Sequence, residues 1–190
     1  MFANCESISQ LDLKHFDTSK VTVLSGMFSG CTSLIYLYVI NFSTKNVKYM
    51  TGMFENCISL HDLELNSFDT SGVISLTNLF SNCYSLLSIN LKNFNTANVY
   101  DMVNTFYNCS SLTDLDLSNF NTKQVNNMNY MFANCTKLKN LNLESFSTEN
   151  CFQFTSTFED CKELTVTLKS DKCQNLIGKI PEYVKVIDKA

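Results

Sequence analysis

Residues 27–57 read MFSGCTSLIYLYVINFSTKNVKYMTGMFENC, and the M-F-x-x-C motif that opens this stretch also closes it. Its two cysteines are 26 residues apart, and the same interval separates all neighbours in the series 5, 31, 57, 83, 109, 135 and 161. A fixed period of this length indicates a repeat architecture, in which each repeat forms one coil of a stack. The complete units are 6–31, 32–57, 58–83, 84–109, 110–135 and 136–161.

The first half of each unit has the spacing of a β-strand. In the unit 32–57, Leu34, Leu37 and Val39 follow the L-x-x-L-x-L pattern of leucine-rich repeats. Successive side chains of a strand point to opposite faces, so we expect Leu37 in the core and Tyr36 and Tyr38 outside. Each unit is therefore predicted to add one short parallel strand to a sheet along the stack.

The second half of each unit has an apolar spacing that fits one face of a helix. In the first unit the apolar positions are Val21, Leu24, Met27, Phe28 and Cys31. Thr18 is a suitable N-cap, because its hydroxyl can accept a free N–H of the first turn. The residue before each cysteine of the series is Gly, Asn or Asp, as at Gly30. These residues tolerate a left-handed backbone, which predicts the C′ position of a helix.

Together these elements predict an α/β solenoid, a right-handed leucine-rich-repeat stack with one short parallel strand and one short helix per 26-residue coil. We expect the solenoid at 1–161, as a partial first coil plus six full coils, and a C-terminal cap at 162–190. The cap should contain a strand near 164–168, a short helix within 171–180 and a last strand near 184–187. Since the chain begins in mid-repeat, we interpret residue 1 as an internal position of a longer parent, or as an uncovered coil through which oligomers could form.

The repeat motif is M-F-x-x-C-x-S-L-x-x-L-x-L-x-x-F-x-T-x-x-V, seen whole at residues 27–47 and recurring from residue 1 to about 161. It resembles the 26-residue repeat of the BspA-like leucine-rich-repeat family of bacterial surface proteins. The resemblance implies a cell-surface or secreted protein that adheres to host or matrix proteins, and it implies no enzyme activity. The family's binding residues lie outside the repeat motif, so the resemblance assigns no role to any position here.

Charge and hydropathy argue against two classes of partner. The formal net charge is -4, whereas a surface for nucleic acid or anionic lipid needs clustered basic residues. No apolar run approaches the ~20 residues of a membrane span, and the N-terminus lacks the basic start and apolar core of a signal peptide. We expect no nucleic acid and no direct membrane insertion. The resemblance favours the cell surface or secretion, and the unpaired thiols favour a cytoplasmic alternative.

The cysteine series is the most suggestive chemical feature. A metal site needs thiolates a few residues apart or histidines nearby, but His15 and His61 occupy different repeat positions. Cysteines on neighbouring coils would be ~4.8 Å apart, beyond the ~3.5–4.5 Å between Cβ atoms that a disulfide needs. We therefore interpret the series as buried, reduced thiols that pack like small hydrophobes. Cys173, in the cap, is expected to be the most reactive thiol, and no metal, cofactor or catalytic residue is predicted.

The outward positions of the strands vary between coils while the core positions repeat, as on a surface free to serve recognition. We predict that the concave sheet face binds a ligand through Tyr36, Tyr38, Ile40, Asp62, Glu64, Asp114 and Asp116. Tyrosine joins a large apolar area to a hydrogen-bonding tip and is common at the centre of interfaces. The alternative is an ordinary solvated face whose carboxylates only keep the sheet soluble. Calcium binding would also use carboxylates, but no D-x-D-x-D-G loop is present.

The sequence therefore predicts a non-catalytic binding module for cell-surface adhesion or protein-ligand recognition, with a host or matrix protein as partner. Two alternatives use the same fold. The first is an intracellular protein-interaction scaffold, and the second is a structural spacer that holds another domain away from a surface.

Overall fold

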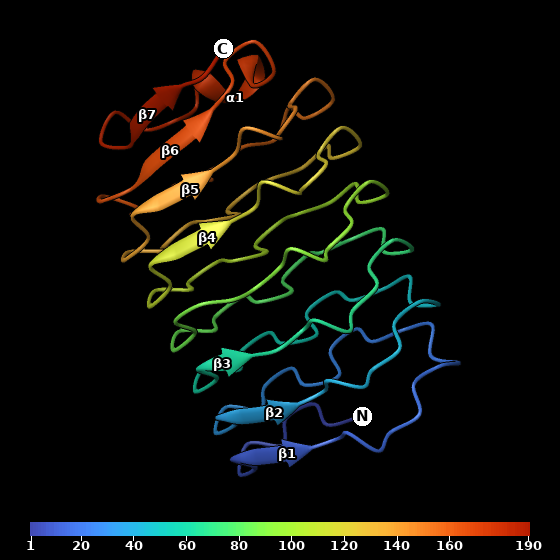
Figure 1. The fold of residues 1–190 in the computed structure, drawn as a ribbon. Coiled ribbons are helices and arrows are strands. Elements are labelled where there is room, and N and C mark those ends of the chain that lie inside the picture. The colour runs from blue at the N-terminus through green and yellow to red at the C-terminus, as the bar shows by residue number, and fades with distance from the viewer.

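Each 26-residue unit forms one coil, and the coils stack in chain order so that their strands lie side by side (Figure 1). The computed structural model describes residues 1–190. The strands are β1 (Gln10–Asp12), β2 (Tyr36–Tyr38), β3 (Asp62–Leu63), β4 (Asp114–Asp116), β5 (Asn140–Asn142), β6 (Thr165–Leu168) and β7 (Lys185–Asp188). They form two parallel sheets, ordered β1-β2-β3 and β4-β5-β6-β7. The predicted repeat solenoid is confirmed.

The constant repeat length keeps equivalent residues in register across the stack. Leu37 of β2 pairs with Leu11 on one side and with Leu63 on the other. Leu37 and Leu63 are buried, whereas the residues that flank them on the strands are exposed. The unit 84–109 contributes no strand at Ser88–Asn90, and this interruption divides the two sheets.

The prediction of one short helix in each coil is wrong. The chain has one α-helix, α1 (Gln174–Ile177), and the second half of each coil is built from turns. In the first coil, the N–H of Leu24 and that of Phe28 donate to the next coil, at Tyr49 O (2.8 Å) and Met53 O (2.9 Å). The N–H of Met27 instead donates within its coil, to Leu24 O at 3.1 Å. Alternate residues thus bond between coils, and these bonds replace the i to i−4 bonds of a helix.

Two left-handed residues in every coil prevent a helix in this half. The position before each cysteine has positive φ, as expected from its Gly, Asn or Asp, although it ends no helix. A second series, four residues earlier, was not foreseen: Gly26, Gly52, Asn78, Asn104, Tyr130 and Ser156. Their φ angles lie between 50° and 61°, and most L-residues reach this region only with strain.

The recurring threonines connect coils rather than cap helices, which corrects the N-cap prediction for Thr18. The Thr18 hydroxyl donates to Ser43 O at 3.1 Å and accepts the N–H of Ser43 at 2.8 Å. The same reciprocal pair links Thr44, Thr70, Thr96 and Thr122 to the residue 25 positions further on. In each of these five coils, a buried hydroxyl therefore satisfies both backbone groups of one residue in the next coil.

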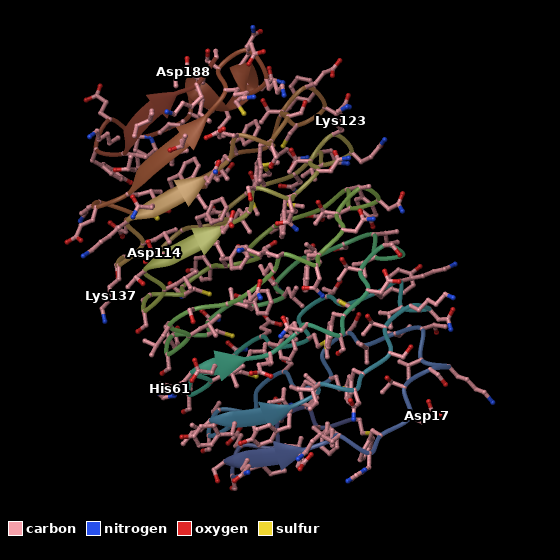
Figure 2. The ribbon with its side chains drawn as sticks, in the orientation of Figure 1. Asp17, His61, Asp114, Lys123, Lys137 and Asp188 are labelled. Carbon is pink, nitrogen blue, oxygen red and sulfur yellow. The ribbon has the colours of Figure 1, made fainter.

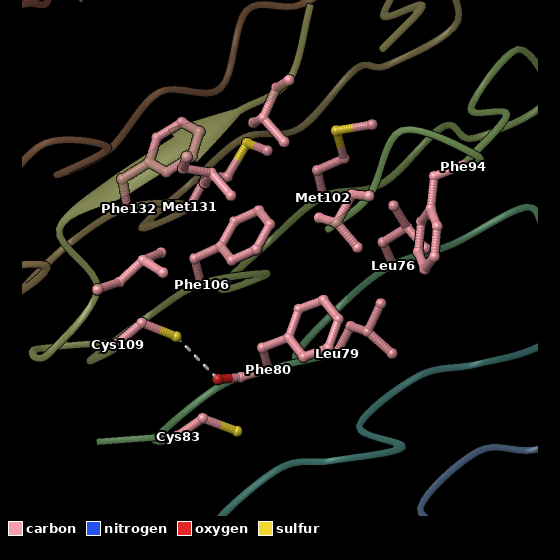
Figure 3. Close-up of a cluster of buried hydrophobic side chains, with 14 of the residues drawn as sticks. Leu76, Leu79, Phe80, Cys83, Phe94, Met102, Phe106, Cys109, Met131 and Phe132 are labelled. Atoms are coloured by element: carbon pink, nitrogen blue, oxygen red, sulfur yellow. Dashed lines mark hydrogen bonds between the residues drawn. The ribbon is translucent and has the colours of Figure 1, made fainter. Parts of the chain in front are cut away.

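The core is continuous along the stack. The series Phe2, Phe28, Phe54, Phe80, Phe106, Phe132 and Phe158 forms a column of near-parallel rings with centroids 5.5–5.8 Å apart. Figure 3 shows Phe80, Phe106 and Phe132 one above another, surrounded by Leu and Met side chains. No coil encloses its own apolar side chains, so the fold depends on contact between coils.

The C-terminal segment carries its own elements. Residues 165–168 form β6, α1 is shorter than the segment expected to be helical, and β7 follows Pro181. No helix of the structure has the length and apolar character to cross a membrane.

Candidate ligand-binding surface

The sheet side of the stack exposes the three outward columns of the coils, which we call the sheet face. It comprises the positions equivalent to Tyr36, Tyr38 and Ile40 in the six complete coils. Figure 2 shows Asp114 on this side of the stack, and Asp17 and Lys123 on the turn side. All seven residues expected to bind a ligand are exposed: Tyr36, Tyr38, Ile40, Asp62, Glu64, Asp114 and Asp116. Alternation along each strand explains their exposure.

Five of these residues line one hollow, which we call the tyrosine hollow. Its volume is about 140 Å³, and its walls are Tyr36, Leu37, Tyr38, Ile40, Asp62 and Glu64. Tyr36 and Tyr38 are 51% and 38% exposed and Ile40 is 43% exposed, although each stands beside polar neighbours. The strand register sets Tyr36 directly beside Asp62. The hollow therefore has an apolar wall from one coil and an acidic wall from the next.

Asp114 and Asp116 do not join that hollow. They line a separate, more polar depression of about 350 Å³ with Asn140, Asn142 and other residues of the second sheet. The interruption at residues 88–90 lies between the two places. The predicted site residues thus form two groups, which the sequence alone did not separate.

The carboxylates of the sheet face differ in whether they have partners. Asp116 accepts the N–H of Ser118 at 3.0 Å, and hydrogen bonding by Ser118 lowers the pKa of Asp116. Asp114 accepts a hydrogen bond from the Asn140 side chain at 3.2 Å. Asp62 and Glu64 accept no hydrogen bond and form no ion pair within the chain. These two carboxylates are the free acidic groups beside the tyrosines.

A lysine already lies against one side of the tyrosine pair. The Lys14 ammonium is 5.6 Å from the centroid of the Tyr38 ring and 2.9 Å from a carboxylate oxygen of Asp12. The hydrogen bond from Lys14 lowers the pKa of Asp12. Tyr38 and Asp12 are register partners on β2 and β1. A tyrosine and a carboxylate on adjacent strands therefore hold a basic side chain on this face.

The cysteine series has a structural role. All nine cysteines are free, and no group of His, Cys, Asp or Glu side chains could hold a metal ion. The thiol of Cys109 donates to Phe80 O at 3.2 Å, as Figure 3 shows, and the same bond recurs at each later coil junction. Burial raises the pKa of Cys57 to about 12 and that of Cys83 well above its usual range. These thiols stay protonated and inaccessible, so they cannot act as nucleophiles at neutral pH.

The expectation that Cys173 is the most reactive thiol is wrong. Cys173 is fully buried, and burial raises its pKa to about 11. Its Sγ lies 3.6 Å from Phe146 O, so the cap uses this residue as the coils use theirs. Cys5, in the first coil, is the only cysteine that is not buried.

The sequence did not indicate the exposed aromatic side chain of Phe152 on the turn side, which lies among mostly polar residues. Phe152 is 75% exposed and contributes to two hollows, of about 360 Å³ and about 420 Å³. The equivalent positions are Thr22, Lys48, Ile74, Tyr100 and Asn126. A helix in this half of the coil would not place these positions in a ladder across the coils. The N–H of Tyr100 donates to Ile74 O and the N–H of Asn126 donates to Tyr100 O, so these positions form such a ladder.

A known family matches most of the chain. The family described as "Mycoplasma protein of unknown function, DUF285" matches residues 1–112 and 75–179. The two matched regions overlap and together span the coils and most of the C-terminal segment. A comparison with curated proteins gives no match.

Proposed function

Since the chain belongs to the family described as "Mycoplasma protein of unknown function, DUF285", its function must be inferred from its surface, and we propose that it is a non-catalytic protein-binding module. The sheet face binds the ligand, with the tyrosine hollow at the centre of the contact. The observation that carries this proposal is the exposure of Tyr36, Tyr38 and Ile40 together on an otherwise polar face. Clustered exposed aromatic side chains are where interface energy is usually concentrated.

We further propose that the chain is a BspA-like adhesion protein of the cell surface or a secreted one. Its repeat motif resembles that of the BspA-like proteins, and a host or matrix protein is the corresponding ligand. The free cysteines do not conflict with an oxidising environment. Oxidation needs an accessible thiolate, whereas Cys83, Cys109 and Cys135 are buried and burial raises their pKa values.

An intracellular scaffold would use the same sheet face on a cytosolic partner. The observation that favours it is the presence of nine free cysteines and no disulfide, which is the usual state of cytosolic proteins. Immunolabelling of intact and permeabilised cells separates the two locations. Labelling of intact cells supports the surface protein, and labelling that requires permeabilisation supports the scaffold.

The binding proposal is tested by capture of ligands with three forms of the 190-residue chain. Wild type, the double variant Tyr36→Ala/Tyr38→Ala and the control Lys20→Glu/Lys45→Glu are each incubated with extracellular matrix proteins and with host-cell lysate. The lysines of the control are exposed and lie outside the sheet face. A ligand retained by wild type and control but lost with the tyrosine variant supports the proposal. A ligand retained equally by all three forms places the contact elsewhere.

A further inference from the structure

The tyrosine hollow has the composition of a receptor for one basic side chain. We propose that it binds a lysine or arginine side chain on an extended segment of a partner protein. The aliphatic part would lie against Ile40 and the tyrosine rings, and the charged end would contact Asp62 and Glu64. This inference rests on the proposed binding function and adds the chemistry of the ligand.

The chain itself shows that this combination of groups holds a basic side chain. Lys14 lies over the Tyr38 ring with its ammonium on Asp12, the register partner of Tyr38 on β1. An ammonium group is attracted electrostatically to the face of an aromatic ring. On the β1 side of the tyrosines, this chain therefore supplies the aromatic ring, the carboxylate and the basic side chain.

On the β3 side of the tyrosines, this chain supplies the aromatic rings and the carboxylates but no basic side chain. Asp62 is the register partner of Tyr36, and Glu64 lines the same hollow as Tyr38. The position equivalent to Lys14 in this coil is Asn66, so β3 brings no lysine of its own. Both carboxylates are without a partner in the chain. A basic side chain from another protein would complete here the arrangement that Lys14 completes on the other side.

The charge of the sheet face favours the same ligand. Its three columns contain six carboxylates and two lysines in the complete coils, a net charge of -4 that equals the formal net charge of the whole chain. The rest of the molecule is thus neutral on balance. An acidic face attracts basic segments and repels nucleic acids and anionic lipids.

The size of the hollow favours a single side chain. Its volume is about 140 Å³, whereas pockets for drug-sized molecules usually hold ~300 Å³ or more. It lies open on the flat side of a sheet beside a larger polar depression of about 450 Å³, which shares Asp62 and Glu64. An extended segment could lay one basic side chain into the hollow while its backbone remains over the polar depression.

The test uses two blocked peptides, Gly-Ser-Leu-Lys-Leu-Ser-Gly and the same peptide with glutamine in place of lysine. Each is titrated into the full chain while the ring resonances of Tyr36 and Tyr38 are followed by NMR. We expect saturable shifts with the lysine peptide and at least tenfold weaker binding of the glutamine peptide. Binding of the lysine peptide should also weaken when salt is raised.

Two pairs of substitutions separate the hollow from general electrostatics. Asp62→Asn/Glu64→Gln should weaken the lysine peptide at least tenfold, and Asp114→Asn/Asp116→Asn should change its affinity less than twofold. Both pairs remove two charges from the same face. A third variant, Asn66→Lys, places a lysine two residues after Glu64, as Lys14 follows Asp12, and should weaken binding of the peptide by pairing with the Glu64 carboxylate. Asn66→Lys changes none of the residues that line the hollow. It therefore keeps the test decisive if the Asp62→Asn/Glu64→Gln variant fails to fold.

Equal binding of the two peptides, or equal effects of the two neutralised pairs, would overturn the inference. Absence of any shift at Tyr36 and Tyr38 would do the same. In these cases the proposed function survives if the captured ligand is still lost with Tyr36→Ala/Tyr38→Ala. If that double variant keeps its ligand, the proposed function fails as well.

Discussion

Cysteine suits its position in each coil because it is small, apolar and a weak hydrogen-bond donor. The carbonyl of Phe80 accepts both the N–H of Cys83 at 3.2 Å and the thiol of Cys109 at 3.2 Å. A larger side chain would clash with the neighbouring coil, and alanine would leave the second bond unmade. The sequence correctly predicted burial of the series, but it did not indicate this bond, because the acceptor is a backbone atom 29 residues away.

The buried thiols predict loss of stability at alkaline pH. The unfolded chain releases thiol protons near pH 9.0, whereas Cys83 and Cys109 keep theirs to much higher pH in the folded chain. Above pH 9.0 the unfolded state therefore binds fewer protons than the folded state, so the free energy of unfolding falls as pH rises. Each buried thiol contributes up to ~1.4 kcal/mol per pH unit to this fall.

Urea denaturation between pH 9 and 11 measures the effect. The double variant Cys83→Ala/Cys109→Ala should be less stable than wild type at pH 7, and its stability should fall less steeply with pH. If wild type and variant lose stability at the same rate, the two thiols release their protons over the same pH range in the folded and unfolded chains, and burial does not raise their pKa.

The column of phenylalanine rings predicts a large difference between core and surface substitutions. Phe80 is 1% exposed and stacks on Phe54 and Phe106. Phe80→Ala should lower the free energy of unfolding by about 3–5 kcal/mol. Glu64→Gln, on the sheet face, should change it by less than about 0.5 kcal/mol. Similar losses in the two variants, measured by urea denaturation, would show that the assignment of inward and outward faces is wrong.

At the scale of the element, the sequence predicted the strands better than the turns. Alternation in residues 36–40 fixes which side chains face the core, and the structure places every one as expected. The spacing of Leu24, Met27 and Phe28 also fits a helix, but the same residues here point inward from a chain of turns. Pattern alone cannot separate these cases, because the deciding bonds join residues 25 positions apart. The two left-handed positions in each coil exclude a helix, but in the second series Tyr130 and Ser156 do not have the residue types that mark such a position in a sequence.

The sequence likewise predicted one part of the candidate site and not another. Exposure of Tyr36 and Tyr38 follows from alternation, which the sequence contains. Which carboxylates remain free was not predictable, because it depends on the reach of Lys14 and on the local turn at Ser118. Asp114 is separated from the tyrosine hollow by the whole coil 84–109, whose outward residues Ser88 and Asn90 carry no charge. The repeat spacing contains this separation, whereas the interruption of the sheet at residues 88–90 was not indicated by the pattern.

The threonine hydrogen bonds between coils predict that removal of one hydroxyl lowers the free energy of unfolding. The Thr96 hydroxyl donates to Asn121 O at 2.9 Å and accepts Asn121 N–H at 2.8 Å. Thr96→Val keeps the shape but leaves both backbone groups without a partner, which should cost about 1–3 kcal/mol. Thr96→Ser keeps the hydroxyl and should retain most of the stability. Equal losses for valine and serine would mean that packing, and not hydrogen bonding, determines the role of this residue.

At the scale of the whole molecule, one repeated coil provides both a constant core and a variable surface. The core residues recur every 26 positions because every coil must fit its neighbours. The outward positions meet only solvent or a ligand, so they can differ, and in the coil 32–57 they are apolar and exposed. The proposed binding therefore depends on which coil carries which outward residues, and the tyrosine hollow lies where the aromatic coil meets the acidic one.

The affinity of a captured ligand for three forms of the chain tests this account most directly. Titration calorimetry compares wild type, Tyr36→Ala/Tyr38→Ala and the control Lys20→Glu/Lys45→Glu, after equal melting temperatures confirm that all three are folded. The account predicts at least tenfold weaker binding by the tyrosine variant, about 1.4 kcal/mol, and nearly unchanged binding by the control. Unchanged affinity in the tyrosine variant together with loss of binding in the control would contradict it.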